Sequence, residues 1–310
     1  MKTSAPVIST LLVAVLALAV GCLSTVAKKD SEKTPSASTG GGGIIAYSVT
    51  SKNVTNQLFT IKANGSGKRQ ITNVAGRACG PDLSPDGSKF AYYNHFNELS
   101  WSLFTVDSNG DNPVQLTDVQ NVWDARPRWS PEGKKIAFCR TYPQDNYREE
   151  IWVIDPDGIN AHRVGTINGN CPFWSKDGER LLFTSWVGSA NEIFEMNADG
   201  SNPTQLTNLK SEIYWPQWSP DNSRNVFQSN KDGDEEIYVM QSDGTNITQL
   251  TQNTAEDGDA DWSPDGTRLV FVSKRDGHYE LYLMNADGTG QARLTSTVLH
   301  AIQPDWKPAK

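Results

Sequence analysis

Two short motifs recur six times along this chain of 310 residues, and their spacing constrains the fold more than any other feature. The first is a WSPDG-like pattern that returns every 44 to 46 residues. Its central positions are Leu83, Trp129, Trp174, Trp218, Trp262 and Trp306. The second is an apolar run followed by Asn-Gly or Asp-Gly, and it keeps step with the first. A period of this length, built from short β-rich runs, predicts propeller blades, each a four-stranded sheet.

Local chemistry separates four strands within one repeat, which we call A to D in chain order. In the fifth repeat we predict them at 212–218, 223–229, 235–241 and 247–251. The C–D turn carries Asn-Gly or Asp-Gly in every repeat, and such pairs suit the positive φ angles of tight hairpins. The recurring tryptophans are predicted to pack between blades.

The two ends of the repeat region complement each other. The first repeat opens at Ile44 with a B strand, and segment 300–306 is an A strand with no B, C or D strand after it. Pairing the two covers edges that would otherwise template aggregation. The predicted fold is therefore all-β, a six-bladed β-propeller of four-stranded antiparallel blades over 44–310, closed by pairing strand 300–306 with the first repeat. An open solenoid is the alternative.

These repeats resemble those of the TolB-type propeller family. The resemblance rests on the WSPDG strands and on segments such as IFEMNADGSNPTQLT from Ile193 and IYVMQSDGTNITQLT from Ile237, and it covers residues 44–306. It implies a propeller in the bacterial envelope that binds a protein partner. The α/β domain that precedes the propeller in TolB has no counterpart among these motifs.

The predicted topology gives the propeller two faces of different character. The A–B and C–D turns lie on one face, which we call the turn face, and they hardly vary between repeats. The B–C loops and D–A connections lie on the other, the loop face, and differ strongly in sequence and charge. Function is expected on the diversified loops. Neutral drift of unconstrained loops is the alternative interpretation.

Aromatic and arginine side chains of the kinds enriched in binding hot spots fall on the loop face and the adjoining A strands. The predicted partner-binding residues are Trp101, Trp123, Arg126, Tyr142, Tyr147, Trp186, Tyr214, Trp215, Arg275 and Tyr279. Trp186 and Trp215 are large aromatics that the repeat does not require, which favours a role in ligand contact. The alternative for Trp215 is that it plugs the channel as core.

Catalysis is disfavoured by the motifs. The chain has no G-x-S-x-G nucleophile elbow, and its histidines show no H-x-H spacing. Asp124, Asp257 and Asp259 are expected where the A strands line the channel, so carboxylate chemistry on a glycan is conceivable. We therefore predict a non-catalytic scaffold. A carbohydrate-active enzyme or glycan-binding lectin using the channel mouth is the alternative.

No cofactor is predicted, and Ca²⁺ is the one cation with a candidate loop. Asp232 and Asp234 lie in the acidic B–C loop of the fifth repeat, where a solvated loop is the alternative. The weak candidates for other metals are His95, His278 and His300. The repeat region contains three cysteines, Cys79, Cys139 and Cys171, which are predicted to be buried free thiols.

The N-terminal residues indicate export. Residues 1–22 read as a signal peptide whose apolar core ends in Gly21-Cys22, similar to a lipobox with Cys22 as the lipidated residue. Cleavage without lipidation and an uncleaved anchor are the alternatives. Residues 23–43 are rich in Ser, Thr, Gly and Lys and read as a flexible tether.

Charge narrows the class of partner. Acidic residues number 36 against 28 basic ones, which argues against nucleic-acid binding. The mean hydropathy of −0.53 excludes a polytopic membrane protein. The expected protein is monomeric, touches the membrane only through its N-terminal anchor on the periplasmic or extracellular side, and binds an envelope protein.

Overall fold

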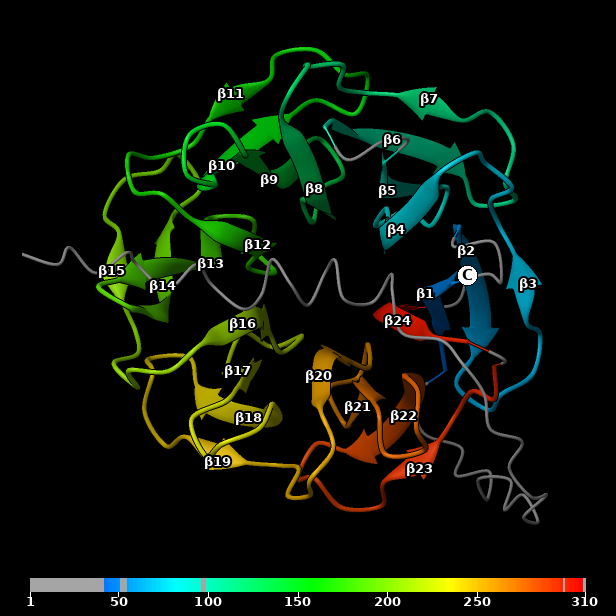
Figure 1. Ribbon diagram of the computed structural model, residues 1–310, viewed down its shortest axis with the longest axis vertical. Coiled ribbons are helices and arrows are strands. Elements are labelled where there is room, and N and C mark those ends of the chain that lie inside the picture. Colours follow the sequence, from blue (N-terminus) through cyan, green and yellow to red (C-terminus); the bar gives the residue numbers. More distant parts are fainter. Residues whose placement is uncertain (1–41, 51–54, 96–98, 298, 309–310) are drawn as a thin grey trace, which may run out of the picture. The chain divides into compact units, whose positions relative to one another are not determined.

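Every regular element in the described part of the computed structural model is a β-strand, and the strands surround a central axis (Figure 1). The structure describes residues 42–50, 55–95, 99–297 and 299–308. The signal segment with Cys22, and all of the tether except Gly42 and Gly43, lie outside these residues. Within them, no helix is long and apolar enough to cross a membrane.

One sheet of twelve strands contains three antiparallel units. Unit one comprises β24 (Ala301–Lys307), β1 (Ile44–Thr50), β2 (Asn56–Lys62) and β3 (Arg69–Gln70). Unit two comprises β4 (Arg77–Leu83), β5 (Lys89–His95), β6 (Trp101–Asp107) and β7 (Val114–Gln115). Unit three comprises β8 (Trp123–Trp129), β9 (Ile136–Tyr142), β10 (Arg148–Ile154) and β11 (His162–Arg163). Single parallel bridges, Asn56 with Arg77 and Trp101 with Trp123, join these units.

The other three sheets are separate four-stranded antiparallel units. Unit four comprises β12 (Asn170–Trp174), β13 (Arg180–Val187), β14 (Ala190–Asn197) and β15 (Thr204–Gln205). Unit five comprises β16 (Ile213–Trp218), β17 (Arg224–Ser229), β18 (Glu236–Gln241) and β19 (Thr248–Gln249). Unit six comprises β20 (Asp257–Trp262), β21 (Arg268–Ser273), β22 (Glu280–Asn285) and β23 (Ala292–Arg293). The strands predicted for the fifth repeat are correct to within about a residue, except that β19 is shorter.

Neighbouring units pack face to face, which explains why the central strands are apolar on both sides. In β17, Val226 packs with the cluster of unit six, and the next residue, Phe227, packs with that of unit four. Trp262 lies in the same cluster as Val226, so the predicted packing of the recurring tryptophans between units is confirmed. The outer strands have only two residues each, which leaves little free edge for another chain to pair with.

The C–D glycines also mediate packing between units. A Cβ on Gly244 would lie 2.2 Å from the carbonyl oxygen of Leu206, in the preceding unit. Gly288 meets Leu250 in the same way, at 2.7 Å. Both glycines have positive φ, near 85°. Glycine is therefore required at these turns for backbone conformation and for space.

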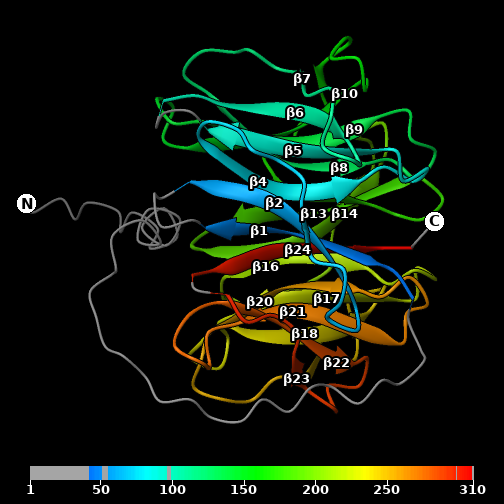
Figure 2. The ribbon, with the colours of Figure 1, turned by 90° about the vertical axis from the view of Figure 1, so that its right-hand side faces the viewer.

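The two ends of the repeat region meet in unit one. β24 pairs antiparallel with β1, with Ile44 opposite Lys307 and Ile45 opposite Trp306, and the strands lie side by side in Figures 1 and 2. On the other side of Trp306, its backbone N–H donates to Asp261 Oδ2 at 2.6 Å, and the Arg268 guanidinium lies over its ring. The C-terminal strand thus contacts both the first and the last units of the described chain.

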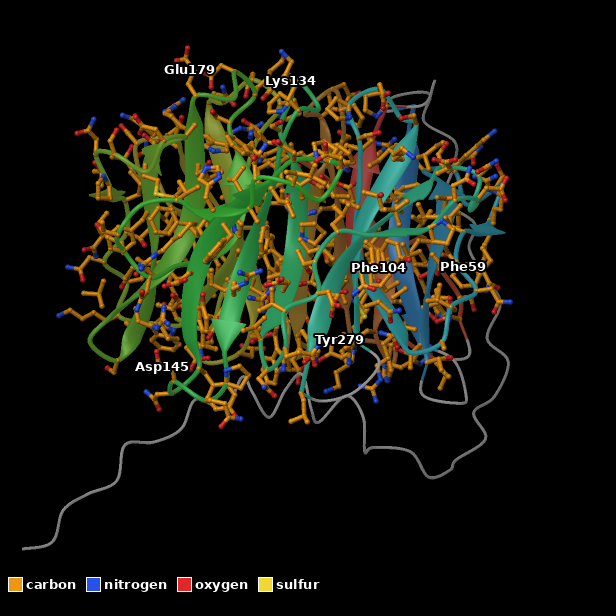
Figure 3. All side chains as sticks on the ribbon, turned by 90° about the horizontal axis from the view of Figure 1, so that it is seen from above. Phe59, Phe104, Lys134, Asp145, Glu179 and Tyr279 are labelled. Carbon is orange, nitrogen blue, oxygen red and sulfur yellow. The ribbon has the colours of Figure 1, made fainter. Side chains whose placement is uncertain are left out.

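The two predicted faces lie at opposite ends of the strands. Figure 3 shows Lys134 and Glu179, from A–B turns, at one end, and Asp145 and Tyr279, from B–C loops, at the other. Cys79, Cys139 and Cys171 are buried free thiols, as predicted. Burial raises the pKa of the Cys79 thiol to about 12, so this thiol is unreactive at neutral pH.

Candidate binding site at the channel and loop face

A ring of six left-handed residues lines the channel. Each stands three residues before a WSPDG centre, and φ lies between 48° and 58° at all of them. The ring consists of Gly80, Arg126, Cys171, Trp215, Asp259 and Gln303. Five of the six are not glycine, so the backbone here is unusual for its residue types. At each of these positions the pairing of the A strand shifts by a β-bulge, which directs the side chain away from the sheet.

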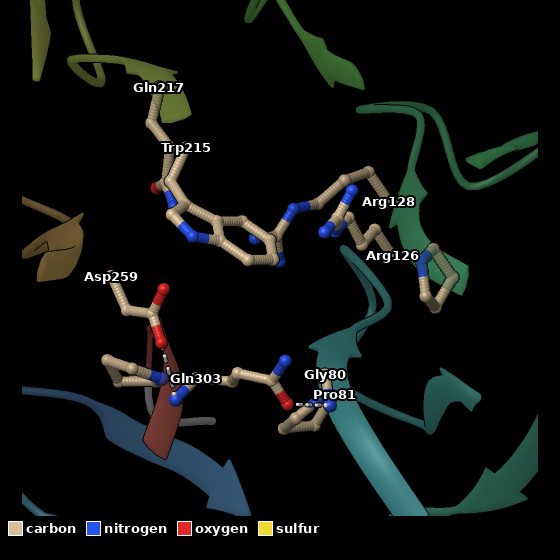
Figure 4. A pocket seen from close by; sticks show the side chains of 10 residues that line it. Gly80, Pro81, Arg126, Arg128, Trp215, Gln217, Asp259 and Gln303 are labelled. Atoms are coloured by element: carbon tan, nitrogen blue, oxygen red, sulfur yellow. Dashed lines mark hydrogen bonds between the residues drawn. The ribbon is translucent and has the colours of Figure 1, made fainter. Parts of the chain in front are cut away.

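Trp215 narrows the channel. Its indole ring lies 4.7 Å from the guanidinium carbon of Arg126, a cation–π contact across the channel that Figure 4 shows from close by. The cavity beside the ring measures about 20 Å³, enough for about one water molecule. Trp215 therefore lines the small cavity that remains at this level of the channel.

Arg126 is held on one wall of the channel by polar neighbours. Its guanidinium hydrogen-bonds Asn170 and lies 3.9 Å from the carboxylate of Glu149. Asn170 in turn donates to Glu149. This network fixes the guanidinium against the Trp215 ring.

Asp259 lies on the opposite wall, and further carboxylates lie on the adjoining loops. Asp259 accepts a hydrogen bond from the backbone N–H of Gln303 at 3.3 Å, yet burial raises its pKa to about 6. Burial, with the charges of Asp259, Glu256 and Glu212 adding to it, raises the pKa of Glu235 to about 7. Asp259 on the wall and Glu235 on the loop face therefore both titrate close to neutral pH.

The C-terminal strand contributes Gln303 to the ring of side chains. Gln303 donates through Nε2 to the Tyr93 hydroxyl at 3.0 Å and accepts through Oε1 from the Gly80 N–H at 2.9 Å. One side chain of unit one thereby fixes two residues of unit two.

On the loop face, aromatic side chains from units two and three form a row. Trp101 and Trp123 stack with ring centroids 4.5 Å apart and planes 9° from parallel. His95 lies 4.9 Å from Trp101 on one side, and Tyr147 lies 5.7 Å from Trp123 on the other. We call His95, Trp101, Trp123 and Tyr147 the aromatic row. It brings together three of the predicted partner-binding residues and one of the histidine candidates.

Three predicted contact residues are engaged elsewhere in the fold. Tyr214 is only 4% exposed, so its assignment to a binding face is wrong: successive strand residues point to opposite sides, and its neighbour Trp215 takes the channel side. Arg275 pairs with Asp257 at 2.7 Å and covers the ring of Tyr282. Tyr142 donates to Glu150 at 2.9 Å beneath the Arg148 guanidinium.

Trp186 and Tyr279 lie on the loop face as predicted, in different surroundings. Trp186, near the end of β13, is 45% exposed. The Tyr279 hydroxyl donates to Glu256, and its ring lies 5.4 Å from His300.

Two of the three predicted channel carboxylates do not reach the channel. Asp124 is fully buried and makes a bidentate pair with Arg140, at 2.7 and 2.8 Å. Asp257 is also fully buried and pairs with Arg275. Their placement in the channel was wrong, because these residues precede the bulge and point into their own units. Asp259 alone lines the cavity.

The metal candidates make ordinary protein contacts. His278 Nε2 lies 2.9 Å from Glu280 Oε1, and His300 Nδ1 accepts from the Tyr279 N–H. Asp232 pairs with Lys231 at 3.1 Å, within the loop it shares with Asp234. Over the described ranges, no three His, Cys, Asp or Glu side chains are grouped as metal ligands.

Sequence reasoning missed the left-handed backbone of the ring and the role of Glu235. The ring had a signal, since proline follows five of its six members, as in Arg126-Pro127 and Trp215-Pro216. Proline cannot donate to the ladder, so inside a strand it is confined to sheet edges and bulges, and β12, β16 and β24 are edge strands that also carry a bulge. For Glu235, the sequence offers no pattern that predicts its role, apart from the acidic residues next to it.

Comparison with known proteins identifies the repeats. A sequence model of the TolB beta propeller domain matches residues 45–215 and 143–310, which together span most of the chain. The chain belongs to the TolB β-propeller family. Its structure is similar to that of TolB from Acinetobacter baumannii, with a TM-score of 0.76 and 20% identity, over 86% of this chain and 67% of that one. At this identity the likeness shows the fold.

Curated relatives of this TolB-family chain match it over shorter stretches. Dipeptidyl-peptidase 5 of Porphyromonas endodontalis is 30% identical over 130 residues, 40% of this chain and 18% of the peptidase. An uncharacterized protein of Agrobacterium fabrum is 26% identical over 42% of this chain and 47% of its own length. The chain thus spans less than half the length of these two relatives.

Proposed function

We propose that this chain is an exported, membrane-tethered and non-catalytic propeller that binds a protein partner at the cell envelope through its loop face. The observation that carries the proposal is the aromatic row, in which Trp101, Trp123 and Tyr147 come together from two units while Trp186 stands exposed on a third. Tyr and Trp dominate the hot spots of protein interfaces. The turn face lacks this diversity, and its Asp side chains bond within their own turns, as Asp221 does with Ser219 and Ser223.

We read the units as six blades of one ring, closed where β24 pairs with β1. Contacts that join other neighbouring units recur at this junction, which supports the reading. Arg224 lies over Trp262 of the next unit at 4.7 Å, and Arg268 lies over Trp306 at 5.1 Å. Such a ring holds the loops of one face in fixed relative positions, as a binding surface requires.

The narrow channel supports binding at the surface. The cavity beside Trp215 has room for about one water molecule, and one carboxylate, Asp259, lines it. A paired-carboxylate mechanism needs two such groups around a bound sugar. Export and tethering rest on the apolar segment that ends at Cys22 and on the tether up to residue 43.

Affinity capture after crosslinking in the native host tests the proposal. The full-length chain carries a C-terminal tag, beside the turn face, and is compared with the Trp186→Ala variant. The wild type is expected to capture a defined envelope protein that the variant loses, because a hot-spot aromatic contributes about 2–4 kcal/mol to binding.

A turn-face variant is the matched control. Lys134→Ala and Glu179→Ala together change the opposite face and are expected to leave capture intact. Loss of the partner from this control but not from Trp186→Ala would overturn the assignment of the binding face. Melting curves of all variants separate lost binding from lost folding.

A further inference from the structure

Exposed apolar side chains gather in one part of the loop face. Seven large hydrophobic residues of the described chain are strongly exposed, and five of them lie in B–C or D–A loops of units two to four or at the end of β13. These five are Leu99, Val119, Tyr147, Trp186 and Val187, each between 39% and 61% exposed. We call them the apolar sector. The aromatic row belongs to the same units and shares Tyr147 with it.

The hairpin of unit four presents the apolar sector most openly. β13 and β14 have eight residues each, against six in the corresponding strands of units five and six, and they continue in register to the pair Val187 and Ala190. Trp186 and Val187 are consecutive and both are more than 40% exposed. An exposed pair of large apolar residues on a rigid hairpin is costly in water unless a partner covers it.

Acidic side chains outnumber basic ones on the remaining part of the loop face, in units five and six. The acidic ones are Glu212, Asp232, Asp234, Glu235 and Glu256, and we call them the acidic sector; the basic ones are Lys210, Lys231, Lys274 and Arg275. Ion pairs engage two members of the acidic sector, Asp232 with Lys231 at 3.1 Å and Glu256 with Lys274 at 3.0 Å.

The carboxylates of the acidic sector repel one another. The charges of Asp259, Glu256 and Glu212 add to burial in raising the pKa of Glu235 to about 7, and the charge of Lys274 opposes them. A cation placed among these groups would relieve the repulsion, and such complementarity governs both partner choice and encounter rate.

From these two sectors we infer that the partner binds through a basic amphipathic segment, whose apolar side chains cover the sector of units two to four while its Lys or Arg side chains lie over the acidic sector. This inference rests on the proposed function of the loop face and adds the chemistry of what binds there. An anionic membrane surface fits less well, because the carboxylates of the acidic sector would repel its headgroups.

Peptide binding to the full-length protein tests the inference. The probe is a fluorescein-labelled 18-residue amphipathic peptide of Leu and Lys, and two comparison peptides replace all Lys by Glu or all Leu by Ser. The Leu–Lys peptide is expected to bind at least tenfold more tightly than either, and its affinity should fall with added salt. Equal binding of the Leu–Glu peptide would overturn the inference.

Charge-reversal variants locate the site. Glu212→Lys with Asp234→Lys is expected to weaken Leu–Lys binding at least tenfold, whereas Asp199→Lys with Asp243→Lys, which makes the same charge change on the turn face, should weaken it less than threefold. If both variants lose the same affinity for the peptide, binding depends only on the net charge of the protein, and the inference is overturned. Binding of phosphatidylglycerol vesicles that depends on Trp186, without peptide binding, would point to a membrane instead and would also overturn it.

The partner-capture experiment separates this inference from the proposed function. If Trp186→Ala loses the captured partner while the Glu212→Lys, Asp234→Lys variant keeps it, the loop face binds but the partner is not basic. If neither variant changes capture, the proposed function itself fails. Loss of the partner from both variants, with the turn-face variant unaffected, is the expected result.

Discussion

The Arg268 guanidinium lies 5.1 Å from the centre of the Trp306 ring, a contact between the last full unit and the strand that ends the described chain. Trp306 is 2% exposed and packs in a cluster with Ile45, Tyr47 and Val270. Residues from the beginning and the end of the propeller therefore share one core.

Trp306→Ala should destabilise the propeller by about 3–5 kcal/mol, because a buried tryptophan is replaced by a cavity at the junction of β24 and β1. Thermal or urea unfolding measures the change. Trp186→Ala is the matched control, since Trp186 is 45% exposed, and it should cost less than about 0.5 kcal/mol. Equal stability of the two variants would contradict a stabilising role of Trp306 at the junction of β24 and β1.

Gly244→Ala should cost more stability than Gly277→Ala. The two glycines have similar φ, 86° and 91°, so the conformational cost of alanine is about 1–2 kcal/mol at either position. A Cβ at Gly244 also meets the Leu206 carbonyl at 2.2 Å, whereas at Gly277 nothing lies within 4 Å. We expect a difference of at least about 1 kcal/mol in the free energy of unfolding. If the two variants have the same free energy of unfolding, the backbone around Leu206 moves aside at no cost in stability.

The stabilising contribution of Glu235 should be lost as the pH rises from about 4.5 to 7. Glu235 has a pKa near 7 in the folded protein, above its ordinary value, so the folded state holds this proton more tightly than the unfolded chain. The unfolded state therefore loses its proton first, and the stabilisation disappears as the pH approaches 7.

Glu235→Gln should remove this contribution and leave two others. Burial raises the pKa of Asp259 to about 6, which acts in the same direction, and lowers the pKa of His95 to about 4, which acts in the opposite direction. At pH 8 we expect the variant to exceed the wild type by about 1–2 kcal/mol, relative to their difference at pH 4. Urea titrations at several pH values measure this effect. Asp199→Asn, on an exposed turn, is the control. The same pH dependence in Glu235→Gln as in the wild type would refute the assignment.

Cys22→Ser should change how the chain is held at the membrane. If Cys22 is the lipidated residue, the variant appears in the soluble fraction or accumulates as a precursor of higher mass. Fractionation with mass spectrometry distinguishes these results. Unchanged mass and unchanged membrane association would favour an uncleaved anchor.

Much of the fold could be predicted because its motifs repeat. The features that could not be predicted lie where one unit differs from the others. Trp218 and Trp262 recur because each fills the same space between units, so one sequence sufficed to assign them to packing. Tyr214 and Trp215 are adjacent and both aromatic, and only the bulge at Trp215 decides which of them faces the channel.

The candidate site was less predictable because its contacts cross between units. Trp101 and Trp123 stand 22 positions apart in the sequence, and their stacking depends on how two units meet at the single bridge between β6 and β8. Burial, together with carboxylates from other parts of the chain, raises the pKa of Glu235 to about 7, and no local sequence pattern reveals either cause.

Ile44 and Lys307 are register partners, so the chain enters and leaves the propeller at neighbouring points on the turn face. A domain whose two ends are adjacent can be inserted into a loop of another protein, or fused to one of its ends. Neither arrangement requires the strands of the domain or the backbone of the other protein to distort. The same geometry leaves the loop face directed away from whatever carries the domain. Different proteins that contain such a domain can therefore share one propeller fold and differ in the partner that its loops recognise.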